Sequence, residues 1–503
     1  MAVEKTESIV TPSGNDINPK AELGHVHSLQ ESAISDALDE QEEKKLLKKI
    51  DLWLMPLLTV AYMLQFLDKV SLSYASIMGI IQDLNLIGTD YTWSSSVFYF
   101  GFLAFSYPAS FLMVRLPLGK YLAVTCISWS VVLACHAAVS NFGGLIAVRF
   151  FLGATEASIS PGFSLITGMW YKRQEQPFRH GLWFFGNSVS AMFGGLLAYG
   201  IAHITVSIEA WRWLFIILGI ITFAWGVVLL LFLPDQPGSA RFLSQDERVK
   251  AVDRIRRNQT GVKDSHFRWA QVREAFVDPQ VWLLIIFQLA FCISNGGFIT
   301  FSNIVIAGFG FKTLDVYLLN IPIGVAHAIF SLGATFLCGR LPGSRTLVAA
   351  ALSIVSLIGS MLVRFGPNTG SKLAGMYLMI AFVAGFPISL SMISSNVAGF
   401  TKKAVASAMM FVAYCAGNIA GPFLFFASEA PVYQSGFIAT AICFGASALA
   451  MFALRTYLIY ENRRRDQLQA GNQPTIRPTA EQAHSSALSD PTDKENQSFR
   501  YVY

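Results

Sequence analysis

Charged residues are scarce in this sequence. Only 14% of its 503 residues are Asp, Glu, Lys or Arg, against about 25% in an average soluble domain. Of the 69 charged residues, 45 lie in segments 1–51, 235–280 and 461–503, which leaves 24 for the other 363 residues. A soluble protein of this size cannot keep so uncharged a surface in water, because large apolar patches drive association. The composition excludes a soluble enzyme, a DNA-binding protein and a secreted disulfide scaffold, and indicates a protein whose sides face lipid.

Several motifs are also missing. The six cysteines form no CxxC pair or Cys/His cluster, so we expect structural thiols and no metal site. There is no Walker A sequence, Gly-rich phosphate loop, HExxH or GxSxG, which argues against ATP-driven transport, hydrolysis and a cofactor. The net charge of +5 is not placed as a nucleic-acid site would require. The first 50 residues lack the apolar core of a signal peptide, so we expect the first membrane segment to start insertion.

What the sequence does contain is long apolar runs. A bilayer core about 30 Å thick needs about 20 apolar residues as a helix. Twelve such runs occur, and they lack the alternation of a lipid-facing barrel. They lie near residues 52–74, 93–113, 121–140, 144–168, 181–203, 212–233, 281–305, 315–338, 346–365, 372–396, 404–427 and 433–458. The sequence therefore predicts an all-α integral membrane protein.

Basic residues predict the orientation, because Lys and Arg near helix ends are retained on the cytoplasmic side. Alternate loops collect them. The predicted outer side holds only Arg212, Lys312, Arg364 and Lys372, whereas the predicted inner side holds many more, among them Lys44, Lys45, Lys48, Lys49, Arg115, Lys120, Lys172, Arg173, Arg179, Arg340, Arg345, Lys402, Lys403 and Arg463 to Arg465. We expect both termini and the central loop to be cytoplasmic.

The runs divide into two groups of six. We expect a disordered tail at 1–50, a six-helix bundle at 51–233, a central loop at 234–280, a second bundle at 281–460 and a disordered tail at 461–503. Lys172-Arg173 precedes Gly186-Asn187 and Gly194-Gly195, much as Lys402-Lys403 precedes Gly417-Asn418 and Gly421-Pro422. Such correspondence is typical of a duplicated transporter with its site between the halves.

Four charged residues interrupt the apolar runs. Asp68 and Lys69 lie in the first run, and Arg149 and Glu156 lie in the fourth. A charge near the bilayer centre costs at least about 2.5–3.5 kcal/mol, so each is a functional candidate. Arg149 and Glu156 are seven residues apart, which puts them on one helix face about 10 Å apart along the axis.

We expect Asp68 and Arg149 to form a charge pair that is made or broken as a cavity changes sides, while Glu156 takes up and releases a proton. Burial raises the pKa of a carboxyl group and a nearby arginine lowers it, so a change of surroundings can load or unload the proton. The alternative is a static Asp68–Arg149–Glu156 network that only holds the first and fourth helices together.

Uncharged polar residues in the apolar runs are weaker candidates. Gln288, Asn295, Asn187 and Asn418 could hydrogen-bond a ligand, but hydrogen bonds between helices explain each of them as well. A lone buried histidine such as His327 is more often structural. Glycine and proline at Ser160-Pro161-Gly162, Gly385-Phe386-Pro387 and Gly421-Pro422 permit bends in their helices.

Several runs support a family resemblance. The sequence RFFLGATEASISPGF at 149–163 resembles the fourth-helix signature of the anion:cation symporter family within the major facilitator superfamily. Others resemble its fungal, allantoate permease-like branch: FLDKVSLSYA at 66–75, WSSSVFYFGFLAFSYPAS at 93–110, LPLGKYL at 116–122, GMWYKRQEQPFRHGLWF at 168–184, WRWLFIILG at 211–219, LPDQPGSARFLSQDER at 233–248 and GNIAGPFLF at 417–425. The matching runs extend over nearly the whole membrane region.

The resemblance implies two pseudo-symmetric six-helix bundles, alternating access, and uptake of a small organic anion with protons across the fungal plasma membrane. Family members carry allantoate, nicotinate, pantothenate, biotin and related carboxylates. It also implies that Arg149 and Glu156 belong to the coupling and binding region. Two features depart from the pattern: Lys69 stands where many relatives have arginine, which removes bidentate carboxylate binding, and VRLPLGKYL at 114–122 lacks the acidic residue of the superfamily loop motif.

The leading hypothesis is a monomeric, proton-coupled symporter of an organic anion. Glu156 and Asp68 would couple protons, and Arg149, Lys69, Gln288, Asn295, Asn187 and Asn418 would bind substrate. Two alternatives stay open: an exporter, for instance of a fungal secondary metabolite, and a nutrient sensor that binds without transporting. The tails are short for a signalling domain, which ranks the sensor last.

Overall fold

The computed structural model describes the backbone of residues 19–172, 174–204, 208–256, 267–471 and 490–503, and these residues form helices, turns and extended segments without a β-strand. The chain divides into two compact units, Met1–Leu54 and Met55–Tyr503. The first helix, α1 (Pro19–Ile77), begins in the first unit and continues into the second. The helix therefore overlaps the part of the expected disordered tail from Pro19 to residue 50, and residues 1–18 lie outside the described part.

Twelve spans among the described residues are long and apolar enough to cross a membrane, as predicted. The first six are Gln41–Ile77 of α1, α3 (Asp90–Arg115), α4 with η1 (Leu118–Cys135, His136–Ala138), α5 with α6 (Phe142–Glu156, Ile159–Trp170), α7 with α8 (Gln176–Phe184, Gly186–Ala202) and α9 (Ala210–Phe232). The last six are α12 (Pro279–Gly308), α13 (Thr313–Arg340), α14 (Arg345–Phe365), α15 with η3 and α16 (Thr369–Met379, Ile380–Ala384, Gly385–Asn396), α17 with η4 (Phe400–Ala420, Gly421–Leu424) and α18 (Gln434–Gly471).

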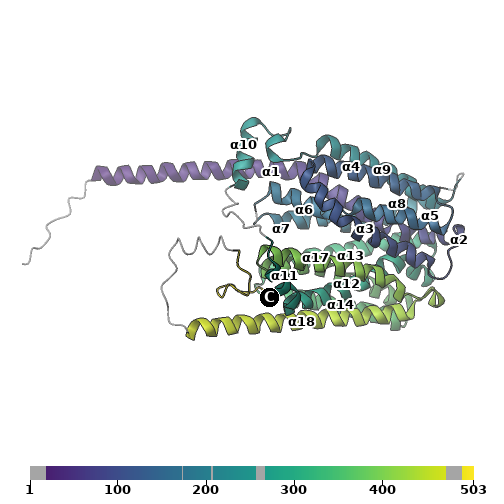
Figure 1. Ribbon diagram of the computed structural model, residues 1–503. Coiled ribbons are helices and arrows are strands. Elements are labelled where there is room, and N and C mark those ends of the chain that lie inside the picture. The colour runs from purple at the N-terminus through teal and green to yellow at the C-terminus, as the bar shows by residue number, and fades with distance from the viewer. Residues whose placement is uncertain (1–18, 173, 205–207, 257–266, 472–489) are drawn as a thin grey trace, which may run out of the picture. The chain divides into compact units, whose positions relative to one another are not determined.

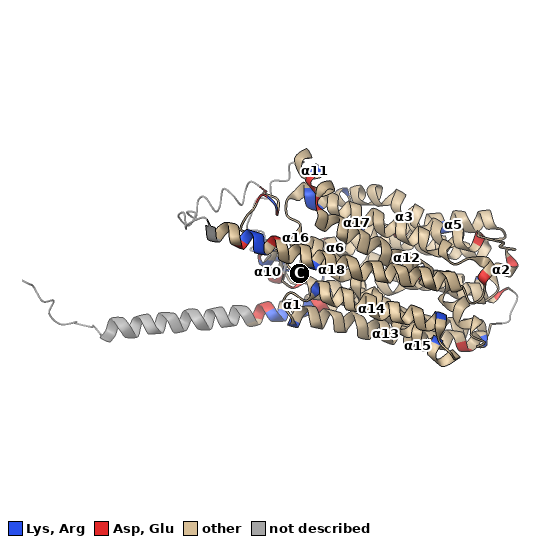
Figure 2. Ribbon diagram, turned by 90° about the horizontal axis from the view of Figure 1, so that it is seen from below, with Lys and Arg blue, Asp and Glu red and all other residues tan. Residues whose placement is uncertain are grey.

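Within the second unit the helices form two groups that lie side by side (Figure 1). The first half runs from Met55 to α9 and the second from α12 to α18. Inside the halves, α3 packs on α5 and α4 on α9, as α12 packs on α17 and α14 on α18; α8 with α13 and α3 with α17 join the halves. Charged residues gather near the ends of the helices and leave the middle mostly uncharged (Figure 2), as lipid-facing spans require.

Three predicted bends occur beside prolines. The fourth span breaks between Glu156 and Ile159, because Pro161 has no N–H to donate to the carbonyl four residues earlier. Pro387 follows the 3₁₀ segment η3 of the tenth span, and Pro422 lies inside η4 at the end of the eleventh. The break in the fourth span places Glu156 at the last position of α5.

Two glycines allow α3 and α5 to pack in close contact. A Cβ on Gly101 of α3 would collide with the carbonyl of Phe150, and one on Gly153 of α5 with that of Phe98. The predicted repeat also has a structural counterpart: Gly186 of α8 packs on the α1 backbone at Thr59, and Gly417 of α17 packs on α12 at Leu289. Fifth and eleventh spans thus meet the first and seventh in equivalent ways.

The remaining elements lie between the spans. They are α2 (Ile80–Asp83), η2 (Pro237–Ser239), α10 (Gln245–Arg256), α11 (Trp269–Val277) and η5 (Ala427–Glu429). The predicted disorder of 461–503 is wrong for its described parts, since α18 continues to Gly471 and segment 490–503 packs on the second half. Its polar side chains find buried partners there, which composition could not reveal. Residues 472–489 lie outside the described part.

Candidate functional site

Asp68 lies fully buried in the first half, on the part of α1 that packs against α4 and α9. Its Oδ2 accepts hydrogen bonds from Trp129 Nε1 at 2.8 Å and from Thr222 Oγ1 at 3.2 Å. No ion pair joins Asp68 to Arg149, so the predicted charge pair is absent from this conformation. The aspartate instead connects the first, third and sixth spans, because those aromatic and hydroxyl donors are closer to it.

Glu156 occupies the last position of α5 and is fully buried. Neither carboxyl oxygen accepts a hydrogen bond of normal geometry from the described residues, although the Gln65 side chain lies nearby. Two cations, Lys69 and Arg149, interact with it electrostatically. An unpaired carboxylate in such a place costs several kcal/mol, and the two positive charges offset part of that cost.

Arg149 lies on the same helix, also buried. Its Nε donates to the backbone oxygen of Ser94 at 3.1 Å, and its guanidinium lies 5.7 Å from the centre of the Phe98 ring. Its Nη1 has no hydrogen-bond partner among the described residues. The close α3–α5 contact at Gly153 brings Ser94 and Phe98 within reach. The guanidinium group is thus held on α3 through Nε, whereas Nη1 remains without a hydrogen-bond partner among the described residues.

Lys69 is only half-buried and lies among aromatic rings. Its Nζ is 5.3 Å from the ring centre of Phe98, 6.0 Å from that of Tyr99 and 5.9 Å from that of Phe102. It also lies within electrostatic range of Cys415 on α17, in the other half. Ring contacts can stabilise a partly desolvated ammonium group. Lys69 therefore connects the Glu156 site to the interface between the halves.

The predicted polar candidates differ in whether their side-chain amides have hydrogen-bond partners. Asn295 donates to Asn418 across 2.8 Å and links α12 to α17. Gln288 accepts from Ser389 at 3.0 Å and donates to the Cys292 sulfur at 3.2 Å, so both ends of its amide are satisfied within the second half. Asn187 is buried and its Oδ1 has no partner in the described chain.

A small cavity of about 70 Å³ lies between the halves. Its lining includes Ser73 and Tyr74 of α1, Asn295 of α12, and Asn320 and His327 of α13. His327 Nδ1 lies 2.6 Å from Ser188 Oγ of α8, which joins the halves, while its Nε2 has no partner among the described residues. Asn295 is the one predicted substrate residue in this lining.

A row of hydrogen bonds joins the halves nearer the side opposite the central loop. Tyr91 donates to the Thr300 carbonyl at 2.9 Å, Ser95 and Thr300 share a bond of 2.7 Å, and Ser96 donates to the Ile419 carbonyl at 2.9 Å. We refer to these bonds as the far seam. A larger cavity of about 770 Å³ lies at the helix ends on the same side, with Tyr91 and Thr92 in its wall.

Three neighbours of the charged residues were missed at the sequence level. Gln65 lies three residues before Asp68, and its polarity within an apolar run was a usable signal. Trp129 and Thr222, the donors to Asp68, carried none, since tryptophan and threonine are ordinary in membrane helices. Their role depends on how α4 and α9 pack.

One group of acids among the described residues has the proximity of a metal site: Glu274, Asp278 and Asp493 offer oxygens within 4.8 Å of one another. The ammonium nitrogen of Lys402 lies 2.7–2.8 Å from an oxygen of each. The lysine supplies the positive charge a metal would bring, so this cluster is an ion-pair network.

Comparison with known proteins is consistent with this architecture. Residues 58–422 match the family model described as Major Facilitator Superfamily. An uncharacterised transporter of Schizosaccharomyces pombe is 35% identical over 97% of this chain and 95% of its own. The allantoate permease of Saccharomyces cerevisiae is 33% identical over 98% of this chain and 93% of its own, and a thiamine pathway transporter of the same yeast is 31% identical over 91% and 86%.

Solved structures show the same fold at low sequence identity. The xylose transporter of E. coli in a partially occluded inward-open conformation has a TM-score of 0.61 and 13% identity, covering 80% of this chain and 97% of its own. A bacterial homologue of the human lysosomal transporter Spinster, in an inward-facing and occupied conformation, has a TM-score of 0.60 and 15% identity over 80% and 96%.

Proposed function

The chain belongs to the major facilitator superfamily and is a multi-pass membrane transporter, not an enzyme; from this premise we propose that it carries a small organic anion together with a proton. The observation that supports this most is the surroundings of Glu156. A buried carboxyl group without a normal hydrogen bond lies within electrostatic range of two cations, one of which reaches the interface of the halves.

Glu156 is suited to carry the proton. Burying an unpaired carboxylate is costly, whereas the protonated carboxyl is neutral and its burial costs far less. Asp68 lies within electrostatic range and adds repulsion to a charged Glu156. Lys69 and Arg149 act in the opposite direction. A movement that changes water access or the distance to either cation therefore changes proton occupancy.

Lys69 and Arg149 are suited to attract the anion. While Glu156 is charged, it neutralises part of their field, and protonation of Glu156 frees both cations for an anionic ligand. Proton binding and anion binding then favour one another, and by linkage the effect is reciprocal. One proton with one monovalent anion leaves the site's net charge as it was, so loaded and empty carriers bear the same charge.

Alternating access supplies the remaining step. The far seam joins the halves on one side of the site, and the small cavity at Asn295 and His327 lies between them. Opening the far seam while the other end closes would move the site from one side to the other. With basic residues retained inside, we propose cytoplasmic termini, a plasma membrane location and a monomer.

Uptake into proteoliposomes tests the proposal. The probes are radiolabelled allantoate, nicotinate and pantothenate, with thiamine as a cationic control, each measured with and without an inward proton gradient. We expect one or more anions, and not thiamine, to accumulate faster with the gradient. Stimulation only by the opposite gradient would instead support the exporter, and saturable binding without flux would support the sensor.

A further inference from the structure

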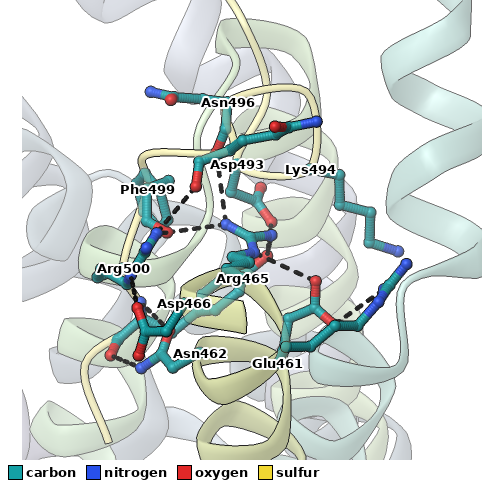
Figure 3. A network of polar contacts seen from close by, with 12 residues as sticks. Glu461, Asn462, Arg465, Asp466, Asp493, Lys494, Asn496, Phe499 and Arg500 are labelled. Atoms are coloured by element: carbon teal, nitrogen blue, oxygen red, sulfur yellow. Dashed lines mark hydrogen bonds and ion pairs between the residues drawn. The ribbon is translucent and has the colours of Figure 1, made fainter. Parts of the chain in front are cut away.

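Segment 490–503 lies against the second half at the ends of its helices on the central-loop side. We call these residues the tail clasp. Figure 3 shows Arg465 and Asp466 of α18 beside Phe499 and Arg500 of the clasp. Arg465 donates to the Phe499 carbonyl at 2.9 Å, and Arg500 pairs with Asp466 at 2.9 Å. The amide of Asn462 exchanges two hydrogen bonds of 2.9 Å with the Tyr501 backbone.

The centre of the clasp is the buried ion-pair network of Lys402. Lys402 Nζ of α17 lies 2.7 Å from Asp493 Oδ1, 2.7 Å from Asp278 Oδ2 and 2.8 Å from Glu274 Oε1. The side chains of Lys402, Asp278 and Asp493 are fully buried. One lysine therefore connects α11, the start of α12, the start of α17 and the clasp.

Asp493 also accepts hydrogen bonds from two other side chains. Tyr501 donates its hydroxyl proton to Asp493 at 2.8 Å, and Gln280 of α12 donates its amide at 3.1 Å. Burial and the neighbouring Asp493 carboxylate raise the pKa of Tyr501, so the hydroxyl stays protonated and able to donate. On α16, the Asn396 amide forms bonds of 2.7 and 2.8 Å with the Val502 backbone, as a paired strand would.

The helices that the clasp joins are of two kinds. α12, α16 and α17 touch the first half: Thr300 bonds Ser95, the Phe386 ring stacks on Phe184 at 6.1 Å, and the Tyr414 ring meets Tyr99 at 6.0 Å. In contrast, α18 packs on α14 and α12. The clasp thus connects α12, α16 and α17, which contact the first half, to α18, which packs within the second half.

A network of this kind specifies an arrangement more than it stabilises one. Buried ion pairs contribute little compared with apolar packing of the same volume, yet removal of one partner is strongly destabilising, which is how registers and switches are set. The clasp contributes one carboxylate to a lysine that retains two others without it. Docking and release are therefore possible without leaving Lys402 unpaired.

We propose that the tail clasp is a regulatory strap that makes α12, α16 and α17 move as one body with α18, so that its docking sets the turnover rate. This rests on the proposed transport function, because rocking of one half against the other requires each half to move as a unit. Docked, the clasp supports turnover. Released, it leaves substrate binding at the distant central site intact and slows the movement of the half.

Asp493→Asn in the full-length protein tests the strap, with Tyr501→Phe as a milder second variant. Gln497→Ala is the matched control, since Gln497 is exposed and bonds its neighbours through its backbone oxygen. Hydrogen–deuterium exchange in nanodiscs needs no substrate. We expect about tenfold faster exchange in 490–503, in α11 and at 397–403 in Asp493→Asn, a smaller increase in the same segments in Tyr501→Phe, and no change in the control.

Flux provides the second measurement. With the anion that the wild-type protein transports best, we expect turnover to fall by about threefold or more at unchanged KM. Unchanged exchange at 490–503, or a released clasp with normal exchange at 397–403 and normal turnover, would overturn the strap. Absence of flux for every probe with the wild-type protein would count against the proposed function alone, because the exchange experiment still decides whether docking orders the helix ends.

Discussion

The indole nitrogen of Trp129 donates a hydrogen bond to Asp68 across 2.8 Å. This contact, rather than a pair with Arg149, holds the carboxyl group of the first span, and it separates the four charged residues of the apolar runs into two groups. Asp68 connects α1, α4 and α9, whereas Lys69, Arg149 and Glu156 form a group that reaches the second half.

Trp129→Phe should lower stability by about 1–3 kcal/mol, because it removes a donor from a buried carboxyl group. Trp93→Phe is the control, since Trp93 is 42% exposed. Thermal unfolding of purified protein measures both. Asp68→Asn and Trp129→Phe should be coupled in the double variant, whereas Asp68→Asn and Arg149→Gln should be additive. Strong coupling between Asp68→Asn and Arg149→Gln would instead support the Asp68–Arg149 charge pair, which is absent from this conformation.

Glu156→Gln should abolish gradient-driven accumulation and spare exchange of substrate across the membrane. The amide keeps the size of the neutral carboxyl group and cannot release a proton. Thr155→Val, one residue earlier, controls for disturbance of the helix, because Thr155 bonds only its own helix turn at Phe151 and Leu152. Accumulation and counterflow in proteoliposomes distinguish the two activities, and normal accumulation by Glu156→Gln would remove the residue from proton coupling.

Lys69→Met should raise the KM for the transported anion by about tenfold, since one of two cations near the interface is lost. Lys69→Arg keeps the charge and should retain most of the affinity. The concentration dependence of uptake supplies the measurement. An equal loss in both variants would mean that the shape of the aromatic surroundings, rather than charge, controls binding at Lys69.

Asn295→Ala and Gln288→Ala should differ in kind. Asn295 lines the cavity between the halves, so its loss should mainly raise KM, with little change in the unfolding temperature. Gln288 is satisfied by Ser389 and Cys292 within one half, so its loss should cost about 1 kcal/mol of stability at unchanged KM. Uptake kinetics and thermal unfolding of both variants give the comparison. The reverse pattern would exclude Asn295 from the substrate site.

Gly153→Ala should prevent accumulation of folded protein, because the new methyl group would overlap the Phe98 carbonyl where α5 meets α3. Gly200→Ala is the matched control, since nothing lies within 4 Å of its added Cβ. Size-exclusion chromatography of detergent extracts reports the folded fraction. Normal yield of Gly153→Ala would show that the α3–α5 contact can widen, and with it the position of Arg149.

The twelve spans were predictable because lipid imposes one local requirement on every spanning residue, and apolar runs of sufficient length meet it. The helix breaks near Pro161, Pro387 and Pro422 were predictable for an equally local reason, the missing N–H of proline. The order of segment 490–503 was not. Its residues are polar, and their burial depends on Lys402 and Asn396, which lie far away in the sequence.

By itself the sequence determined which residues are costly in a membrane, and it identified Asp68, Lys69, Arg149 and Glu156 as the ones needing explanation. Only the tertiary structure decided which partners they have. Helix spacing fixes the face on which a side chain lies, but the donor that reaches Asp68 comes from Trp129, 61 positions along the chain. Partners so distant are brought together by packing between helices, which periodicity within one helix does not encode.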